Sequence, residues 1–274
     1  MPSLLILYHY FHPDDVVSAR LFADIGAAFV HDGWCVEAWP CNRACHASRN
    51  RYAARETWQG LNIDRVWQPP LRQSSSIGRI TNALWMINAW RRRVTSRHAS
   101  PPDLVLTGTD PFFSLTIAPA IKRAWPSTKI VHWCHDLYPE ALAADGRLTR
   151  RNPVYRTLAR AMNDAYRRCD LIASIGPCMR ERLATRSPAR LITLTPWALW
   201  EPEEPATTDI AARRRLFGDA KLALLYSGNY GRAHDAEPFL ALARSLDDAP
   251  IRLAFAARGP RFNEFCASAA GLAN

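Results

Sequence analysis

The sequence lacks any apolar run of about 20 residues, the length that a membrane-spanning helix needs. Its N-terminal stretch, MPSLLILYHYFHPDD, has no basic segment before the apolar residues and no small-residue cleavage site after them. A secretory signal peptide has both features, so this stretch predicts a first β-strand instead. We therefore expect a cytoplasmic protein.

The cysteines do not form a framework with regular spacing. They are odd in number and scattered, at positions 35, 41, 45, 134, 169, 178 and 266. This distribution is not that of a disulfide scaffold and fits a reducing compartment. Cys41, Cys45 and His46 have the spacing of one half of a zinc site, but no second pair of ligands follows at zinc spacing. We expect incidental thiols and no bound metal.

Lysine is scarce, at positions 122, 129 and 221 only, so arginine carries nearly all of the positive charge. The net charge of +10 constrains the partners of the protein and not its fold. Nucleic acid, an anionic membrane surface and phosphorylated small molecules are all compatible with it. The chain contains no recognised nucleic-acid-binding module, and its basic residues do not alternate regularly with aromatic ones, so we do not expect nucleic acid as a partner.

Apolar segments typical of strands alternate with segments of helical periodicity along most of the chain. The strand-like segments are 4–8, 34–39, 61–67, 103–107, 129–134, 170–174, 191–194, 222–226 and 251–256. The helical segments are 16–31, 77–94, 112–124, 153–168, 177–184, 209–217 and 263–270. This alternation predicts an α/β fold with a doubly wound parallel sheet. Residues 40–60 are polar and are predicted to be a loop.

A change in composition near residue 200 predicts a division into domains. The run Trp200-Glu-Pro-Glu-Glu-Pro-Ala-Thr-Thr is rich in proline and acidic residues, as linkers are. We predict an N-terminal domain over residues 1–199, a linker over 200–220 and a second domain over 221–274. Two strand–helix units do not complete an α/β core, so the second domain is expected to be incomplete.

The segment 77–94 allows two interpretations. Its aliphatic residues fall on one helical face: Ile77, Ile80, Leu84, Ile87 and Val94. That pattern predicts a helix packed by this face. The same segment holds Trp85, Trp90 and the run Arg91-Arg92-Arg93, and aromatic residues with arginines on an amphipathic helix also dock on membranes. The packed helix with a solvated charged end is the slightly favoured interpretation.

A glycine-rich turn follows the strand predicted at 222–226. The chain reads Ser227-Gly-Asn-Tyr-Gly231, then Arg232, and a helical pattern starts near Asp235. A strand, a glycine turn and a helix place backbone N–H groups and a helix N-terminus against a phosphate. Arg232 adds a bidentate donor at the same corner. Gly259-Pro-Arg261 follows the next strand in the equivalent position, so Gly228, Asn229, Gly231, Arg232 and Gly259 are candidate phosphate-site residues.

Polar residues also follow two strands of the first domain. His135 and Asp136 end the strand 129–134, where ligands bind in open α/β sheets. A histidine there can hydrogen-bond a hydroxyl or a phosphate, and Asp136 can orient the imidazole or cap the next helix. A polar strand end with a turn-forming aspartate is an equally favoured interpretation. His9 and His12 follow the first strand and line the same edge, although solvated loop residues are the favoured interpretation for them.

Three segments, in this order, resemble the GT-B glycosyltransferases of glycosyltransferase family 4, of the capsule and exopolysaccharide type. Tyr10-Phe-His-Pro-Asp14 with the later Gly33-Trp-Cys-Val36 is similar to the family's "YFPPE" loop and "GHEV" turn. Asp136-Leu-Tyr-Pro-Glu140 is similar to its "DLWPE" segment, and Tyr226-Ser-Gly-Asn-Tyr-Gly231 to its "YSGNxG" turn. The resemblance covers nearly the whole chain.

This resemblance implies two Rossmann-like domains, the first for an acceptor and the second for a nucleotide-sugar. Members transfer the sugar with retention at the anomeric carbon, generally without a metal, so the nucleotide-sugar is a co-substrate and no cofactor is expected. By position, Arg232 would hold the diphosphate, His135 would lie near the transferred sugar, and Gly228, Gly231 and Gly259 would approach the nucleotide. The acceptor is expected to be a lipid-linked glycan at an anionic membrane surface, which places the protein at the inner face of the cell membrane.

The sequence departs from the family pattern at three points. The lysine that often follows the glycine turn is missing, and His234 is its weak substitute, because histidine is mostly neutral at pH 7. The family's "GxG" after the second donor strand is Ala257-Arg-Gly259 here. The family's E-x7-E segment lies further along than residue 274. The chain is therefore expected to be a fragment with little or no transfer activity. A nucleotide-sugar epimerase and a non-catalytic acceptor-binding protein are the alternatives.

Overall fold

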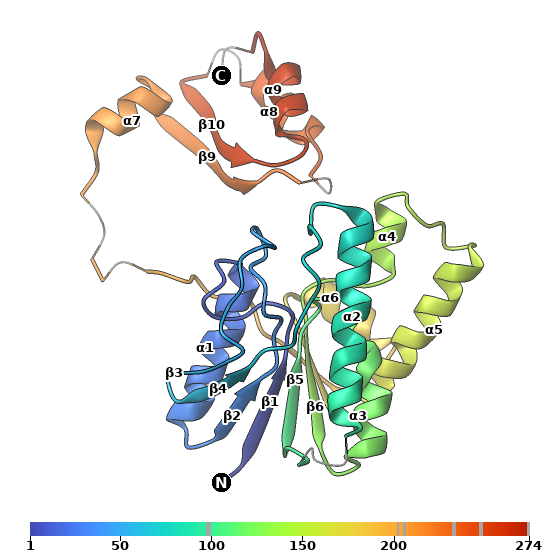
Figure 1. Cartoon of the computed structure of the whole chain (residues 1–274). Helices are drawn as coiled ribbons and strands as arrows, with labels where there is room; N and C mark the ends of the chain where they lie inside the picture. The colour runs from blue at the N-terminus through green and yellow to red at the C-terminus, as the bar shows by residue number, and fades with distance from the viewer. Residues whose placement is uncertain (97–99, 202, 205–206, 232–233, 247–248, 273–274) are drawn as a thin grey trace. The chain divides into compact units, whose positions relative to one another are not determined.

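The computed structural model describes residues 1–96, 100–201, 203–204, 207–231, 234–246 and 249–272 (Figure 1). The chain forms two compact units, Met1–Trp200 (unit 1) and Glu201–Asn274 (unit 2). Within the described ranges, no helix is both long enough and apolar enough to cross a membrane.

Unit 1 is built on an eight-stranded sheet in the order β3-β4-β2-β1-β5-β6-β7-β8. All its neighbouring strands are parallel except β3 and β4. The strands are β1 (Ser3–Leu7), β2 (Cys35–Ala38), β3 (Arg55–Trp58), β4 (Leu61–Asp64), β5 (Leu104–Thr107), β6 (Lys129–Cys134), β7 (Leu171–Ser174) and β8 (Arg190–Thr193). The predicted α/β class and the parallel sheet are confirmed.

Helices cover both faces of this sheet, which explains why its central strands β1 and β5 are mostly apolar. The helices are α1 (Val17–His31), α2 (Ser76–Val94), α3 (Ala118–Ala124) after the 3₁₀ turn η1 (Ser114–Ile117), α4 (Glu140–Ala144), α5 (Pro153–Arg167) and α6 (Pro177–Ala184). In β1, Leu4 and Ile6 pack in the cluster that includes Phe22 of α1. Leu5 and Leu7 pack with residues of α2, α3 and α5, and α2 and α3 lie side by side (Figure 1).

The prediction that residues 40–60 are a loop was wrong for β3. Gln59 and Gly60 both have positive φ angles, of 47° and 79°, which is the geometry of a tight hairpin turn. This turn joins β3 to β4 in antiparallel register. Strand β3 lacks the apolar pattern of a buried strand, because its side chains are half exposed at the edge of the sheet.

The buried face of α2 also differs from the prediction. Its inward face is formed by Asn82, Ala83, Met86, Trp90 and Val94. Ile77, Ile80 and Leu84 are instead 78%, 49% and 62% exposed. The two inward donors are satisfied, because Trp90 Nε1 donates to the Trp39 carbonyl at 2.7 Å and Asn82 Nδ2 to the Leu71 carbonyl at 2.9 Å. Trp90 is therefore a core residue and not a surface aromatic.

Unit 2 contains a parallel pair of strands, β9 (Leu222–Asn229) and β10 (Ile251–Arg258), and the helices α7 (Ile210–Phe217), α8 (Glu237–Ser245) and α9 (Phe262–Ala269). Tyr230, Leu240 and Phe265 form the centre of its small core. The predicted break at Ser227 was wrong, because pairing with β10 continues as far as Asn229 opposite Arg258. The following helix begins at Glu237, near Asp235 as predicted.

The packing of Gly108 generates a test of the core of unit 1. The Tyr8 and Phe22 rings stack with centroids 4.0 Å apart, and a Cβ on Gly108 would lie 2.5 Å from Phe22 Cζ. We expect Gly108→Ala to lower the free energy of unfolding by about 1–3 kcal/mol, because the stacked rings cannot yield. Urea denaturation measures this. Gly176→Ala, whose Cβ would meet nothing within 4 Å, is the control, and an equal loss there would contradict the packing argument.

Candidate functional site

The carboxyl ends of β1, β5 and β6 are adjacent because these strands are neighbours in the sheet. The loop after β5 forms hydrogen bonds with the segments that follow β1 and β6. Thr109 Oγ1 accepts hydrogen bonds from the backbone N–H groups of His135 at 2.8 Å and of Asp136 at 3.3 Å. The Asp110 carbonyl accepts from the His9 N–H at 3.1 Å. Thr109 is thus a positioning residue that the sequence did not reveal, since a buried threonine has no motif of its own.

His135 is held as a neutral imidazole. Its ring lies 4.4 Å from that of Trp133 and edge-on to Phe22 at 6.0 Å, and burial there lowers its pKa to about 4. Its Nε2 atom is buried and has no hydrogen-bond partner among the described residues. A neutral imidazole with an unused nitrogen can bind a hydroxyl group, but it does not supply positive charge at pH 7.

Asp136 does not perform either of the local roles that its position suggested. Within the part of the chain that the structure describes, its carboxylate makes no hydrogen bond to the His135 ring, and α4 has no side-chain cap. Reduced solvation raises the pKa of Asp136, and the nearby Asp110 carboxylate acts in the same direction. His135 and Asp136 therefore act as separate groups on one edge.

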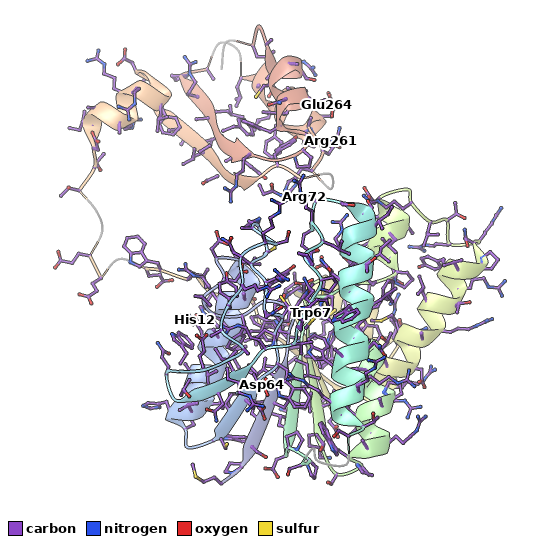
Figure 2. The ribbon with its side chains drawn as sticks, in the orientation of Figure 1. His12, Asp64, Trp67, Arg72, Arg261 and Glu264 are labelled. Atoms are coloured by element: carbon purple, nitrogen blue, oxygen red, sulfur yellow. The ribbon has the colours of Figure 1, made fainter. Side chains whose placement is uncertain are left out.

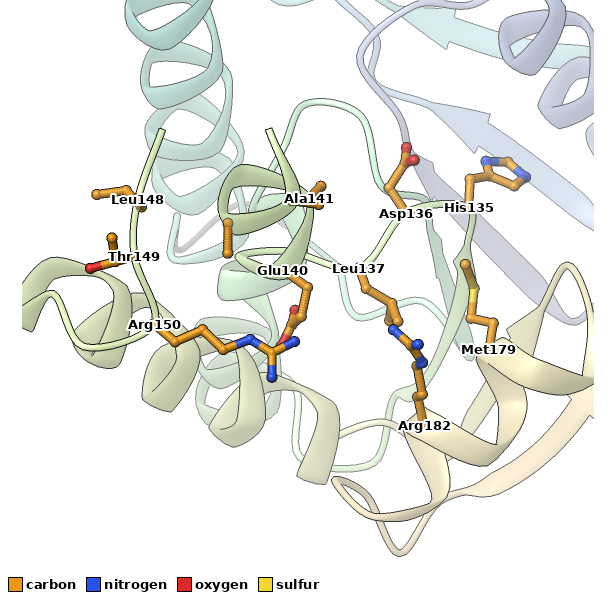
Figure 3. A pocket seen from close by; sticks show the side chains of 12 residues that line it. His135, Asp136, Leu137, Glu140, Ala141, Leu148, Thr149, Arg150, Met179 and Arg182 are labelled. Atoms are coloured by element: carbon orange, nitrogen blue, oxygen red, sulfur yellow. The ribbon is translucent and has the colours of Figure 1, made fainter. Parts of the chain in front are cut away.

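Both residues line a cavity of about 460 Å³ in unit 1 (Figure 3). The rest of its wall comes from the loop before α4, from α4 and the segment after it, and from α6: Leu137, Glu140, Ala141, Ala143, Ala144, Leu148, Thr149, Arg150, Met179 and Arg182. Two guanidinium groups, Arg150 and Arg182, thus share a cavity with aliphatic side chains. This could not be predicted from the sequence, because the two arginines lie outside every motif and 32 residues apart, and they line one cavity only in the folded chain.

Glu140 fixes the position of α4 at this cavity. Its Oε1 atom accepts hydrogen bonds from Arg186 and, at 3.4 Å, from the Tyr155 hydroxyl. Burial raises the pKa of Glu140, but its hydrogen bonds and the charge of Arg186 together outweigh burial, so the net pKa lies below the usual range. Glu140 is therefore ionised at neutral pH and anchors the wall.

His9 and His12 do not have the solvated setting that was favoured for them. His9 is 2% exposed, and its Nε2 lies 2.6 Å from Gln68 Oε1 while Nδ1 lies 3.4 Å from Asp110 Oδ1. His12 stacks on Trp58 at 4.4 Å, where burial lowers its pKa. Neither residue lines the cavity, because His9 is part of the packed interior and His12 packs against Trp58 of β3.

Cys41, Cys45 and His46, which have the spacing of half a zinc site, do not come together. Cys41 is buried and its thiol donates to the Arg43 carbonyl at 3.2 Å, whereas His46 lies 3.9 Å from Asp15. Among the residues that the structure describes, no three histidine, cysteine or acidic side chains come together as metal ligands.

In unit 2 the structure brings most of the predicted phosphate-site residues to one edge of the β9–β10 pair. Gly228 and Asn229 end β9, and the Tyr230 N–H donates to the Arg258 carbonyl at 2.7 Å. Gly259 has a φ of 145°. It lies so close to its neighbours that a Cβ there would be 2.7 Å from the Tyr230 carbonyl carbon and 2.9 Å from Asn229 Oδ1. Both glycines are thus at close contacts or positive φ angles that other residues rarely accept.

The segments that follow β9 and β10 also contain Arg232, His234 and Arg261. Arg232, the predicted diphosphate ligand, lies outside the described residues. His234 Nδ1 accepts from the Gly231 N–H at 3.0 Å, and its carbonyl accepts from Arg261 Nη1 at 3.4 Å. Arg261, paired with Glu264 at 3.1 Å (Figure 2), was part of the predicted turn but had no assigned role. Its place beside His234 could have been inferred from its offset after β10.

The environment of His135 predicts a pH dependence. Its pKa of about 4 in the folded chain lies below the value of about 6.5 in an unfolded one. We expect the ring to stay neutral down to about pH 5, and the free energy of unfolding to fall as the pH decreases from about 6.5 towards 4, because the unfolded chain binds the proton more readily. NMR titration of the ring carbons measures the pKa, with His135→Gln as the control for assignment. A ring that titrates near 6.5 would contradict this account.

Solved structures of similar fold are enzymes that act on sugars. Sucrose-phosphate synthase from Thermosynechococcus elongatus matches with a TM-score of 0.62 and 14% identity, over 93% of this chain and 62% of that one. The catalytic domain of starch synthase IV from Arabidopsis thaliana, bound to ADP and acarbose, matches with a TM-score of 0.55 and 11% identity, over 95% and 69%. These likenesses confirm the predicted GT-B fold class.

A curated relative and a family model agree with this fold. The probable glycosyltransferase WbjE from Pseudomonas aeruginosa is 28% identical over 170 residues, which are 61% of this chain and 42% of that protein. The chain thus spans less than half the length of this relative. Residues 19–196, more than half of the 274 residues, match the domain described as Glycosyltransferase Family 4. The chain belongs to glycosyltransferase family 4.

Proposed function

We propose that this chain forms the acceptor side and the first part of the donor side of a retaining glycosyltransferase. The enzyme moves a sugar from a nucleotide-sugar to a lipid-linked glycan in the synthesis of a cell-surface polysaccharide. The observation that carries the proposal is the neutral His135 at the cavity edge, on a chain of this family. The location follows from the acceptor: the cytoplasm, at the inner face of the membrane.

The two units divide the chemistry between them. The bond from the anomeric carbon to the diphosphate breaks, and a bond from that carbon to the oxygen of an acceptor hydroxyl forms, while the hydroxyl proton passes to an oxygen of the leaving diphosphate. The leaving diphosphate gains negative charge, which backbone N–H groups and cations stabilise. In unit 2, Gly228, Asn229, Gly231 and Gly259 supply close backbone approach, with Arg232 as the cation and His234 beside it. No metal is required by this arrangement, and the nucleotide-sugar is a co-substrate.

His135 binds a hydroxyl of the transferred sugar in this proposal. The buried Nε2 without a described partner supports that role, because its desolvation is compensated only when a ligand arrives. Its pKa of about 4 keeps the ring neutral at pH 7, so His135 contributes by hydrogen bonding and not by positive charge. Arg150 and Arg182 give the cavity two positive groups beside aliphatic side chains, which suits an acceptor that joins a phosphate to a lipid.

Sugar transfer tests the proposal, with this chain and with the longest open reading frame that contains it. UDP-glucose, UDP-N-acetylglucosamine and GDP-mannose serve as donors, and a polyprenyl-diphosphate-linked sugar is the acceptor. In the active form we expect His135→Ala to lower kcat/KM by about 100-fold or more, the cost of losing one hydrogen bond made to the reacting sugar. His31→Ala, on the exposed end of α1, is the matched control.

The products separate the alternatives. Retention of the anomeric configuration, seen by NMR, and transfer that survives EDTA are the expected results. Inversion would contradict the mechanism. An epimerised nucleotide-sugar formed from donor alone would favour the epimerase, and acceptor binding without turnover in both forms would favour the non-catalytic protein.

A further inference from the structure

The outer face of α2 carries an aliphatic stripe that unit 1 does not cover. Ile77, Ile80 and Leu84 are largely exposed, and the half-buried Ile87 continues the row. The three- and four-residue spacing puts these side chains on one face of a helix with 3.6 residues per turn. They form a continuous apolar surface, unlike the isolated exposed apolar residues that most proteins have.

The stripe is not a core face that failed to pack. The opposite face of α2 is filled by Met86 and Trp90, which are both fully buried, and by Asn82. These residues pack α2 against η1 and α3. The helix therefore has one face for the fold and a second apolar face with no partner among the described residues of unit 1.

Two exposed tryptophans lie beside the stripe. Trp67 follows β4 and Trp85 lies on the flank of α2, and they are 49% and 42% exposed. Their rings meet edge to face at 5.0 Å, and Trp85 Nε1 donates to the Trp67 carbonyl at 2.6 Å. Tryptophan combines a large apolar ring with a polar N–H group, and it is enriched where proteins meet the boundary of a membrane.

The charge around this face has one sign. The sequence contains no acidic residue between Asp64 and Asp103, and α2 itself has none. Arg72 lies just before the N-terminal end of α2 (Figure 2), Arg79 lies in its first turns, and Arg91 and Arg92 lie in its last turn, all exposed. Arg72 thus lies before one end of the aliphatic stripe and Arg91 and Arg92 at the other, and the segment 65–102 contains no carboxylate to neutralise them.

We propose that the outer face of α2, with Trp67 and Trp85, docks on a bilayer that contains anionic phospholipid. Aliphatic side chains would enter the boundary between headgroups and acyl chains while the arginines meet lipid phosphates. The absence of acidic groups over this whole segment favours a continuous anionic surface over a protein partner of mixed charge. The inference rests on the proposed function, because a lipid-linked acceptor requires an enzyme that works at a membrane.

Flotation with lipid vesicles tests this docking surface. The chain is expected to float with vesicles of equal parts phosphatidylglycerol and phosphatidylcholine at low salt, and to float much less with phosphatidylcholine alone or at high salt. Ile80→Ser with Leu84→Ser, and separately Arg91→Gln with Arg92→Gln, should each weaken the partition by about 10-fold or more. Circular dichroism checks that these surface variants remain folded.

Helix α7 offers matched controls, because it carries the same residue types in the same kind of exposed helix. Ile210→Ser with Leu216→Ser, and Arg214→Gln with Arg215→Gln, should leave flotation within about two-fold of the unchanged chain, since lone surface changes alter little. An equal loss in the α2 and α7 variants would overturn the proposal, because binding would then follow total charge or hydrophobicity and not this face.

Two further results would also overturn it. The chain could fail to float with anionic vesicles, or Ile80→Ser with Leu84→Ser could convert a dimer to a monomer in gel filtration without changing flotation. The second result would assign the stripe to an interface between copies. Transfer to a detergent-solubilised lipid-linked acceptor by a form that does not bind vesicles would reject the docking surface and leave the proposed function intact.

Discussion

The structure depends on the burial of one parallel sheet from both sides. Because helices cover both faces of β1 and β5, these strands are mostly apolar, and the polar side chains of the candidate site lie where the strands end. The strand order then decides which ends meet, so that Thr109, His135 and Asp136 share one edge. The site of unit 1 is thus a consequence of the sheet, with Thr109 as the hydrogen-bond acceptor that fixes its local shape.

The repeating elements could be predicted from sequence because each signal is local. Strand β6 and helix α6 have the predicted bounds, since an apolar run and a proline at a helix start need no tertiary information. Strand β3 could not be found this way, because Arg65 stabilises it from outside the segment by pairing with Glu56. The exposure of Ile80 and Leu84 could not be predicted from the local sequence either. Helix α2 has apolar residues on both faces, and its packing against η1 and α3 determines which face is buried.

The candidate site likewise has a part that could be predicted from the sequence and a part that could not. His135 and the glycines of unit 2 were predictable because strand ends and positive φ angles leave a trace in the sequence. The cavity beside His135 could not be predicted, because Arg150 and Arg182 are distant in the sequence and line one cavity only in the folded chain. Glu140 holds α4 at this cavity by its bond to Arg186. The charge of His135 also needed the structure, because burial lowers its pKa to about 4 and keeps the ring neutral at pH 7.

The most direct test of this account is to locate nucleoside diphosphate on the chain by NMR. The ¹⁵N-labelled protein would be titrated with UDP and, separately, with GDP. The account predicts that one of them shifts the backbone amides of Asn229, Gly231, His234 and Gly259, at the edge of β9 and β10, and leaves those of the cavity near Glu140 unchanged. Shifts confined to the cavity of unit 1, or no shift with either nucleotide, would contradict the assignment of unit 2 to the donor.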